Sequence, residues 1–180
     1  ESTALCNPYW QYSRDKIACE RVLFDAFVRS GFPVTVVRPS HTYDCRKLPV
    51  QLHGKNGSWQ VAQRILSGKP VVVAGDGTSL WTLTHSRDFA KGFVGLMANA
   101  AAVGEAVHIT SQEGPLLGDK SNSVLFDNSK IKRLVPGFCA QTRAGDGLRE
   151  SVEYALSHPE AAQPDPDFDA WCDDIVRAQG

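Results

Sequence analysis

One stretch of sequence decides the fold: Asn7-Pro8-Tyr9-Trp10-Gln11-Tyr12-Ser13-Arg14-Asp15-Lys16-Ile17-Ala18-Cys19-Glu20. The Asn-Pro pair signals a turn, and apolar residues follow at helical spacing, at Ile17, Phe24, Phe27 and Val28. A helix is therefore predicted to run to about Ser30 and to end at Gly31, with Pro33 close behind.

Tyr12 and Lys16 are the chemical feature of this helix. Residues four apart lie on the same helix face, so a phenol and an ammonium can share one small site. A fixed cation beside a phenol favours the phenolate and lowers the Tyr pKa, which suits the group to proton transfer. The same spacing occurs at Tyr43 and Lys47, but nearby prolines predict a loop there. On pattern alone, a surface Tyr beside a solvated Lys is the favoured interpretation.

The rest of the chain alternates predicted strands and helices. Residues 34–37 predict a strand buried on both faces, as in a parallel sheet. Residues 71–74 and 80–83 predict two strands flanking a hairpin turn at Gly75-Asp76-Gly77-Thr78. Further strands are predicted at 106–110 and 123–126, and helices at 59–66 with Ser58 as N-cap, 86–100, 128–135, 147–156 and 168–178. The helix at 86–100 is expected to bury Phe89, Phe93, Leu96 and Met97. This alternation predicts an α/β fold.

Several blocks, in order, resemble the extended short-chain dehydrogenase/reductase family, and more narrowly its NAD-dependent epimerase/dehydratase type. They are Tyr12-x-x-x-Lys16, Arg38-Pro39-Ser40-His41-Thr42-Tyr43, Gly75-Asp76-Gly77-Thr78, Thr84-His85-Ser86-Arg87-Asp88-Phe89-Ala90, Phe126-Asp127-Asn128-Ser129-Lys130 and Gly147-Leu148. The resemblance implies part of a Rossmann-type doubly wound parallel sheet with a smaller C-terminal substrate lobe. Residues 1–110 would form the late part of the NAD(P)-binding domain with interleaved substrate-lobe segments, and residues 111–180 the substrate-lobe remnant and tail helices.

The same resemblance assigns roles to individual residues. Tyr12 and Lys16 would be catalytic and would also contact NAD or NADP, with Lys16 on the ribose. The Pro-rich and Gly-rich segment 38–57 is predicted to be a loop, and its first residues, Arg38, Pro39, Ser40 and His41, would line the nicotinamide end of the cofactor. Trp81 and His85 would contact substrate, although a packed or hydrogen-bonded role for His85 is favoured by its context. Asp88 is equally suited to capping a helix.

Two departures from the family pattern bear on function. Trp81 stands where many sugar-nucleotide epimerases carry an Arg that pairs with the substrate diphosphate, and an indole cannot make that bidentate contact. An unphosphorylated or more apolar substrate is therefore easier to accommodate. No Gly-x-Gly-x-x-Gly or Gly-x-x-Gly-x-x-Gly sequence occurs, so the main pyrophosphate cradle is missing and the chain is predicted to be a truncated form.

Composition argues against several kinds of partner and of structural site. A net charge of -1 gives no electrostatic reason to expect nucleic acid or an anionic membrane as partner. Five cysteines without a Cys-x-x-Cys pair predict reduced thiols in a cytoplasmic protein, rather than a disulfide or zinc framework. No metal site is predicted, and no run of apolar residues approaches the roughly 20 needed to span a bilayer.

Two functions remain open at this point. The first is an NAD(P)-dependent epimerase, dehydratase or reductase acting on a hydroxyl or carbonyl carbon of a small molecule, with a sugar-related substrate as one option and Tyr12 as acid and base. The second is a non-catalytic relative that uses the same scaffold for binding or regulation. A homodimer through the Tyr12 helix region is considered as a further partner.

Overall fold

The computed structural model describes residues 6–111, 115–117, 124 and 126–179. The chain divides into two compact units. The first takes in the described parts of 1–39, 90–109 and 127–138, and the second those of 40–89, 110–126 and 139–180. The predicted α/β class is confirmed, with parallel strands in both units.

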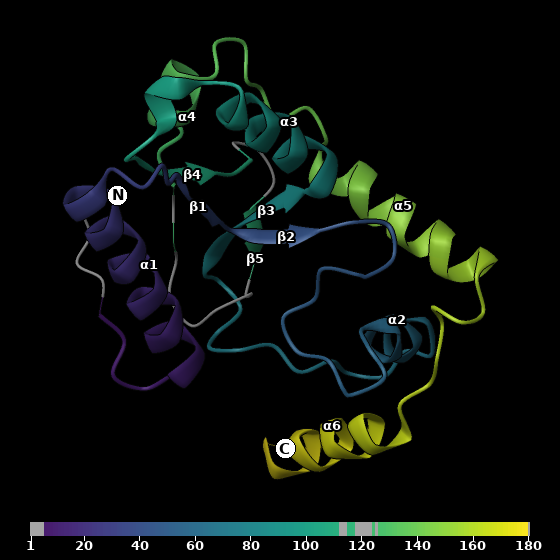
Figure 1. Cartoon of the computed structure of the whole chain (residues 1–180). Helices are drawn as coiled ribbons and strands as arrows, with labels where there is room; N and C mark the ends of the chain where they lie inside the picture. Colours follow the sequence, from purple (N-terminus) through teal and green to yellow (C-terminus); the bar gives the residue numbers. More distant parts are fainter. Residues whose placement is uncertain (1–5, 112–114, 118–123, 125, 180) are drawn as a thin grey trace. The chain divides into compact units, whose positions relative to one another are not determined.

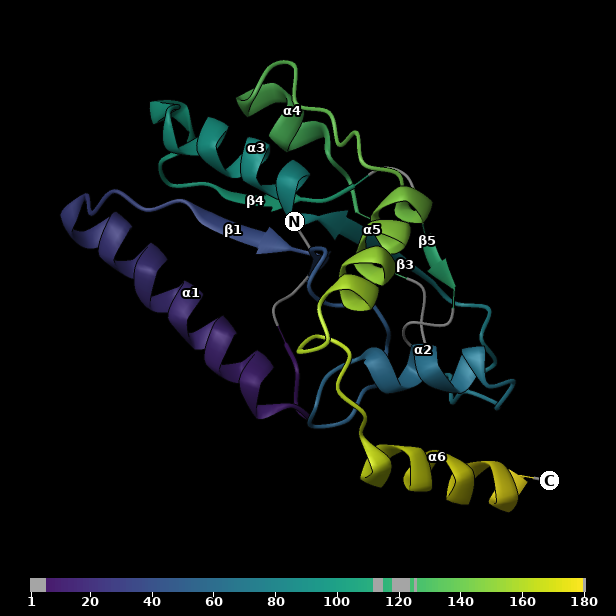
Figure 2. The ribbon, with the colours of Figure 1, turned by 90° about the vertical axis from the view of Figure 1, so that its right-hand side faces the viewer.

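The first unit has a two-stranded parallel sheet with helices on both faces. β1 (Val36–Pro39) pairs with β4 (Ala106–Ile109), and α1 (Gln11–Ser30) lies along one face of the pair (Figure 2). The last part of α3 (Ser86–Met97) and α4 (Ser129–Leu134) cover the other face. Three fully buried side chains, Val107, Ile109 and Ile131, form the centre of this unit.

Close approach between α3 and the sheet depends on a glycine. A Cβ at Gly92 would come within 2.8 Å of Ile109 Cγ2 and 3.0 Å of Phe138 Cε2. This corrects the predicted buried face of α3. Leu96 is buried, but Phe93 is 41% and Met97 75% exposed, because the helix turns its glycine side toward β4.

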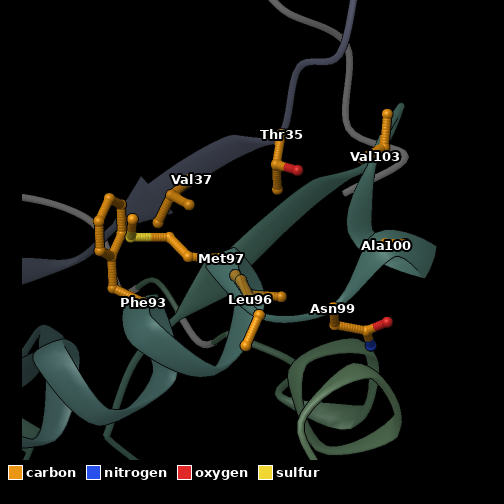
Figure 3. A pocket seen from close by; sticks show the side chains of 9 residues that line it. Thr35, Val37, Phe93, Leu96, Met97, Asn99, Ala100 and Val103 are labelled. Atoms are coloured by element: carbon orange, nitrogen blue, oxygen red, sulfur yellow. The ribbon is translucent and has the colours of Figure 1, made fainter.

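A hollow of about 390 Å³ lies between β1 and α3 (Figure 3). Val37 from the strand and Phe93, Leu96 and Met97 from the helix point toward it. Its lining contains no charged side chain among the described residues and none of the predicted site residues.

The second unit contains a three-stranded mixed sheet in the order β2 (His41–Tyr43), β3 (Leu80–His85), β5 (Pro115–Leu117). β2 runs parallel to β3 and β5 runs antiparallel to it. α5 (Ala144–Ser157) packs against β3, and α6 (Pro166–Gln179) lies beside α2 (Trp59–Leu66) (Figure 1). Leu48, Trp59 and Ala155 form the apolar cluster of this unit.

Three strand predictions need correction. Residues 71–74 are not a strand, so the predicted hairpin is wrong: Leu80 to Thr82, the part of β3 that the hairpin would have used, pair with β5 instead. The predicted loop 38–57 contains β2, whose pairing with β3 is not encoded locally. The strand predicted at 34–37 begins two residues later and is only half-buried, because within the described chain it pairs on one edge alone.

Most helix predictions are confirmed. Gly31 ends α1 in the left-handed conformation at φ 69°, where its N–H donates to the Phe27 carbonyl. α2 has the predicted bounds, but the Ser58 side chain makes no capping hydrogen bond. α3 ends at Met97, short of the predicted 100, and the strand predicted at 123–126 falls largely outside the described residues.

Candidate active site

α1 brings Tyr12 and Lys16 together. The Asn7 carboxamide oxygen accepts hydrogen bonds from the N–H groups of Tyr9 and Trp10 at 3.1 Å each, so it organises the turn that leads into the helix. One turn further on, the Lys16 ammonium lies 5.5 Å from the centroid of the Tyr12 ring. Tyr12 is 56% exposed, so more than half of the residue is accessible to solvent. The catalytic roles of the two residues stay predictions.

Glu20 completes this face of the helix and was missed in the sequence. It follows Lys16 by one turn, and its carboxylate accepts two hydrogen bonds from Arg38 at the end of β1: from Nε to Oε2 at 3.1 Å, and from a terminal nitrogen to Oε1. The side chains are 20% and 11% exposed for Arg38 and Glu20. The sequence signal that points to Glu20 is the spacing of four residues from Tyr12 to Lys16 and from Lys16 to Glu20. Spacing could not identify Arg38, the partner of Glu20, because it lies 18 residues away.

Ser40 belongs to a hydroxyl network in the second unit. Its Oγ lies 2.7 Å from Thr84 Oγ1, which also accepts a hydrogen bond from the Ser111 N–H at 2.9 Å. Thr84 is fully buried in β3, so this network fixes the start of β2 against the strand. Pro39 is exposed at the end of β1, and His41 opens β2 opposite Leu83.

His85 is a packed residue. It is 5% exposed, and the Tyr43 ring meets it edge-on at 5.1 Å. Its Nδ1 accepts a hydrogen bond from the Arg87 N–H at 3.2 Å, and its Nε2 lies 3.3 Å from a Glu150 carboxylate oxygen. Burial, with a contribution from Glu150, raises the pKa of Tyr43. This environment agrees with the packed interpretation of His85, and the substrate role stays a prediction.

Trp81 and Asp88 occupy neighbouring parts of the same unit. The Trp81 indole packs edge-on against Phe126, with ring centroids 6.1 Å apart. Asp88 is almost wholly buried and accepts a hydrogen bond from the Thr142 N–H at 2.8 Å, ahead of α5. Asp88 therefore links the first turn of α3 to the segment that precedes α5, a structural role like the one predicted from its place at the start of a helix.

The predicted site residues divide between the two units. Tyr12, Lys16, Arg38 and Pro39 belong to the first, and Ser40, His41, Trp81 and His85 to the second. Within the described ranges, no three His, Cys, Asp or Glu side chains come close enough to hold a metal ion. No helix in the same ranges is long and apolar enough to cross a membrane.

Residues 1–110 match the model of the NAD dependent epimerase/dehydratase family. The chain belongs to this family. The predicted relationship is thereby confirmed, and with it the NAD dependence and the enzyme class at the level of the family.

Named relatives agree with this assignment. A 2'-dehydrokanamycin reductase from Streptomyces kanamyceticus is 31% identical over 115 residues, which cover 62% of this chain and 31% of the relative. A trifunctional UDP-glucose 4,6-dehydratase/UDP-4-keto-6-deoxy-D-glucose 3,5-epimerase/UDP-4-keto-L-rhamnose-reductase from Arabidopsis thaliana is 25% identical over 174 residues, or 83% of this chain and 25% of the relative.

Solved structures share the fold. A UDP-glucuronic acid 4-epimerase from Bacillus cereus, in complex with NAD, matches with a TM-score of 0.68 and 20% identity, over 85% of this chain and 53% of that one. An epimerase from Methanothermobacter thermautotrophicus matches with a TM-score of 0.69 and 16% identity, over 89% and 53%. The chain thus spans about half the length of these structures and about a third or less of the two curated relatives.

Proposed function

We propose that this chain supplies the proton-transfer and substrate-side residues of an NAD(P)-dependent epimerase, dehydratase or reductase that acts on a hydroxyl or carbonyl carbon. The observation that carries the proposal is the Lys16 ammonium against the Tyr12 ring, 5.5 Å from its centroid, on an exposed face of α1 in a chain of this family. The relatives named for UDP-sugars and for 2'-dehydrokanamycin support a sugar-related substrate.

Tyr12 moves the proton in this scheme. When the substrate alcohol is oxidised, the O–H proton passes to the Tyr12 oxygen while the C–H bond breaks with its electron pair, leaving a carbonyl. When bound, NAD or NADP supplies the hydride acceptor, or the donor in the reverse direction. Lys16 would stabilise the charge on Tyr12 and hold the ribose of the bound cofactor, and Arg38, Pro39, Ser40 and His41 would line its nicotinamide end.

The donor set on α1 fits one end of the cofactor. An exposed phenol and ammonium one turn apart match the hydroxyl groups of a ribose. The pyrophosphate needs backbone N–H groups of a Gly-rich turn between a strand and a helix. β3 passes directly into α3 at His85 and Ser86 without a glycine. We therefore propose that a separate nucleotide-binding half, in the same or a second polypeptide, supplies the cradle.

Trp81 bears on the substrate class. Its indole packs against Phe126 and offers no charged group for a diphosphate. We propose a substrate without a diphosphate at this position. If the missing guanidinium is the cause, Trp81→Arg should improve nucleotide-sugar binding by roughly 1.5–3 kcal/mol. An unchanged affinity, measured by calorimetry, would place Trp81 away from the substrate.

The deciding experiment uses the protein completed with its nucleotide-binding half. Tyr12→Phe should lower turnover by roughly 10²–10⁴-fold with cofactor affinity unchanged, whereas Lys16→Met should weaken both. Tyr9→Phe is the matched control, since Tyr9 is 94% exposed and precedes the helix. Near-normal turnover by Tyr12→Phe would remove Tyr12 from the mechanism.

The 180-residue chain alone provides a second test. Without a pyrophosphate cradle it should bind no NADH measurable by calorimetric titration. Micromolar binding by the isolated chain would mean that the cofactor site lies elsewhere. A completed protein that binds cofactor but turns over no alcohol or carbonyl substrate would favour the non-catalytic, regulatory alternative.

Two further proposals concern the state of the protein. α1 exposes apolar side chains along its length, Val22 at 68% and Val28 at 79%, after Trp10 at 60%, and we propose that a second copy packs against this helix in a homodimer. Val22→Lys with Val28→Lys should then give a monomer in sedimentation velocity if the wild type is a dimer.

All five cysteines are free thiols, Cys172 being buried, which supports a reducing, cytoplasmic location.

A further inference from the structure

Three charged or ionisable residues share one face of α1. Tyr12, Lys16 and Glu20 follow each other at intervals of four, so each is one turn from the next. Lys16 lies between a ring and a carboxylate, and either could hold its ammonium. The structure shows Lys16 over the Tyr12 ring, 5.5 Å from the centroid. Within the described ranges it forms no ion pair with Glu20.

The Glu20 carboxylate pairs with Arg38 and not with Lys16. Its guanidinium donates from Nε and a terminal nitrogen to the two different carboxylate oxygens of Glu20. This two-point geometry is the strong form of a carboxylate contact, which a single ammonium cannot match. The Glu20 side chain is only 11% exposed in this contact, so it is drawn toward β1 and away from its helical neighbour.

We propose that Arg38 is a positioning residue: by holding Glu20, it keeps the Lys16 ammonium on Tyr12. Without Arg38, the freed carboxylate becomes an opposite charge four residues from Lys16, a spacing at which helix side chains form ion pairs, Lys before Glu being the weaker order. The ion pair and the cation–ring contact are of similar strength at an exposed position, so Lys16 would divide between the two. The effect on Lys16 stands by itself, and its effect on a reaction rests on the proposed function.

The test follows Lys16 directly by NMR in the chain itself. Protons held over an aromatic face are shifted upfield, so the Lys16 ε-methylene signal reports its contact with Tyr12. Tyr12→Leu gives the baseline without the ring. In Arg38→Gln the upfield shift should fall to roughly one half to three quarters of its wild-type size, since the ion pair is at most about as strong as the ring contact. In Arg38→Gln combined with Glu20→Gln it should return to the wild-type value, because no carboxylate remains to compete.

A measurement of stability separates positioning from simple structural support. Arg38→Gln also leaves the largely buried Glu20 carboxylate without its partner, so a merely structural role predicts that the Lys16 signal follows the urea midpoint across the wild type, the single and the double variant. The proposal would be overturned if the Lys16 ε-methylene shift is unchanged in Arg38→Gln, or if the shift in the double variant equals that in Arg38→Gln. If Arg38→Gln does not fold, Arg38→Lys with and without Glu20→Gln is compared in the same way, since Lys cannot form the two-point contact.

Turnover of the completed protein gives an independent readout. If Tyr12 and Lys16 act as proposed, Arg38→Gln should lower the rate measurably more, by up to about twofold, in the wild-type background than in a Glu20→Gln background, because only a carboxylate at position 20 can divert Lys16. An equal loss of rate in the two backgrounds, as a direct cofactor contact of Arg38 alone would give, would overturn positioning as a role of Arg38 in the rate. The NMR pattern in a protein without any turnover would instead contradict the proposed function and leave the positioning of Lys16 intact.

Discussion

Gly147→Ala should destabilise the second unit, although the same exchange normally strengthens a helix. Gly147 lies in α5, and a Cβ there would sit 2.0 Å from the Tyr43 hydroxyl oxygen, 2.8 Å from Cζ and 2.9 Å from Cε2. Tyr43 is itself buried, at 6% exposure, with its ring against His85. The phenol therefore cannot swing into solvent without breaking that contact, and either α5 or the Tyr43 ring must shift.

Gly145→Ala is the matched control, because Gly145 is in the same helix and a Cβ there would meet nothing within 4 Å. Both variants gain the helix preference of Ala over Gly, roughly 0.5–1 kcal/mol. Only Gly147→Ala overpacks a buried site, which costs about 1–3 kcal/mol. The shared gain cancels, so the two unfolding free energies should differ by about 1–3 kcal/mol. Each kcal/mol corresponds to roughly 2–4 °C in the midpoint of a protein of this size.

Circular dichroism during thermal and urea unfolding measures both variants. Tyr43→Phe adds a second comparison, since it removes the oxygen at 2.0 Å and should reduce the penalty of Gly147→Ala. Equal midpoints for Gly145→Ala and Gly147→Ala would refute the reasoning. So would a penalty of Gly147→Ala that is the same with and without the Tyr43 hydroxyl.

Three other outcomes are expected. Arg64→Met should cost about 2–4 kcal/mol of unfolding free energy, because this fully buried guanidinium pairs with Asp169 and Asp173 of α6, whereas Lys55→Met at an exposed pair should leave the urea midpoint unchanged. A hydrogen bond from Lys69, and then one from Arg64, hold the pKa of Asp169 below its ordinary value, so its contribution is present above about pH 4 and is lost as the pH falls further; the hydrogen-exchange protection factors of α6, which are corrected for the slower intrinsic exchange in acid, should therefore fall. Burial raises the pKa of Tyr43, so the unfolded chain loses this proton first and stability should fall as the pH rises above about 10 in urea titrations.

Local signals in the sequence determined most helices of this protein. α1 ends at Gly31 because only a residue without a Cβ readily takes φ 69°, and α2 keeps its predicted bounds between Ser58 and Gly68. The placement of Tyr12 beside Lys16 also follows from helix geometry alone, since residues four apart share a face in any α-helix. These features need no information from distant parts of the chain.

Only the tertiary structure decided which segments form strands and which charged side chains form ion pairs. Residues 71–74 are as apolar as a strand, but Leu80 to Thr82, with which a hairpin would pair them, form their hydrogen-bonded pairs with β5 instead. Glu20 pairs with Arg38 rather than with Lys16 because β1 brings a two-point donor within reach of its carboxylate. Both choices depend on competition between partners far apart in the sequence, and such competition is settled only when the chain is folded.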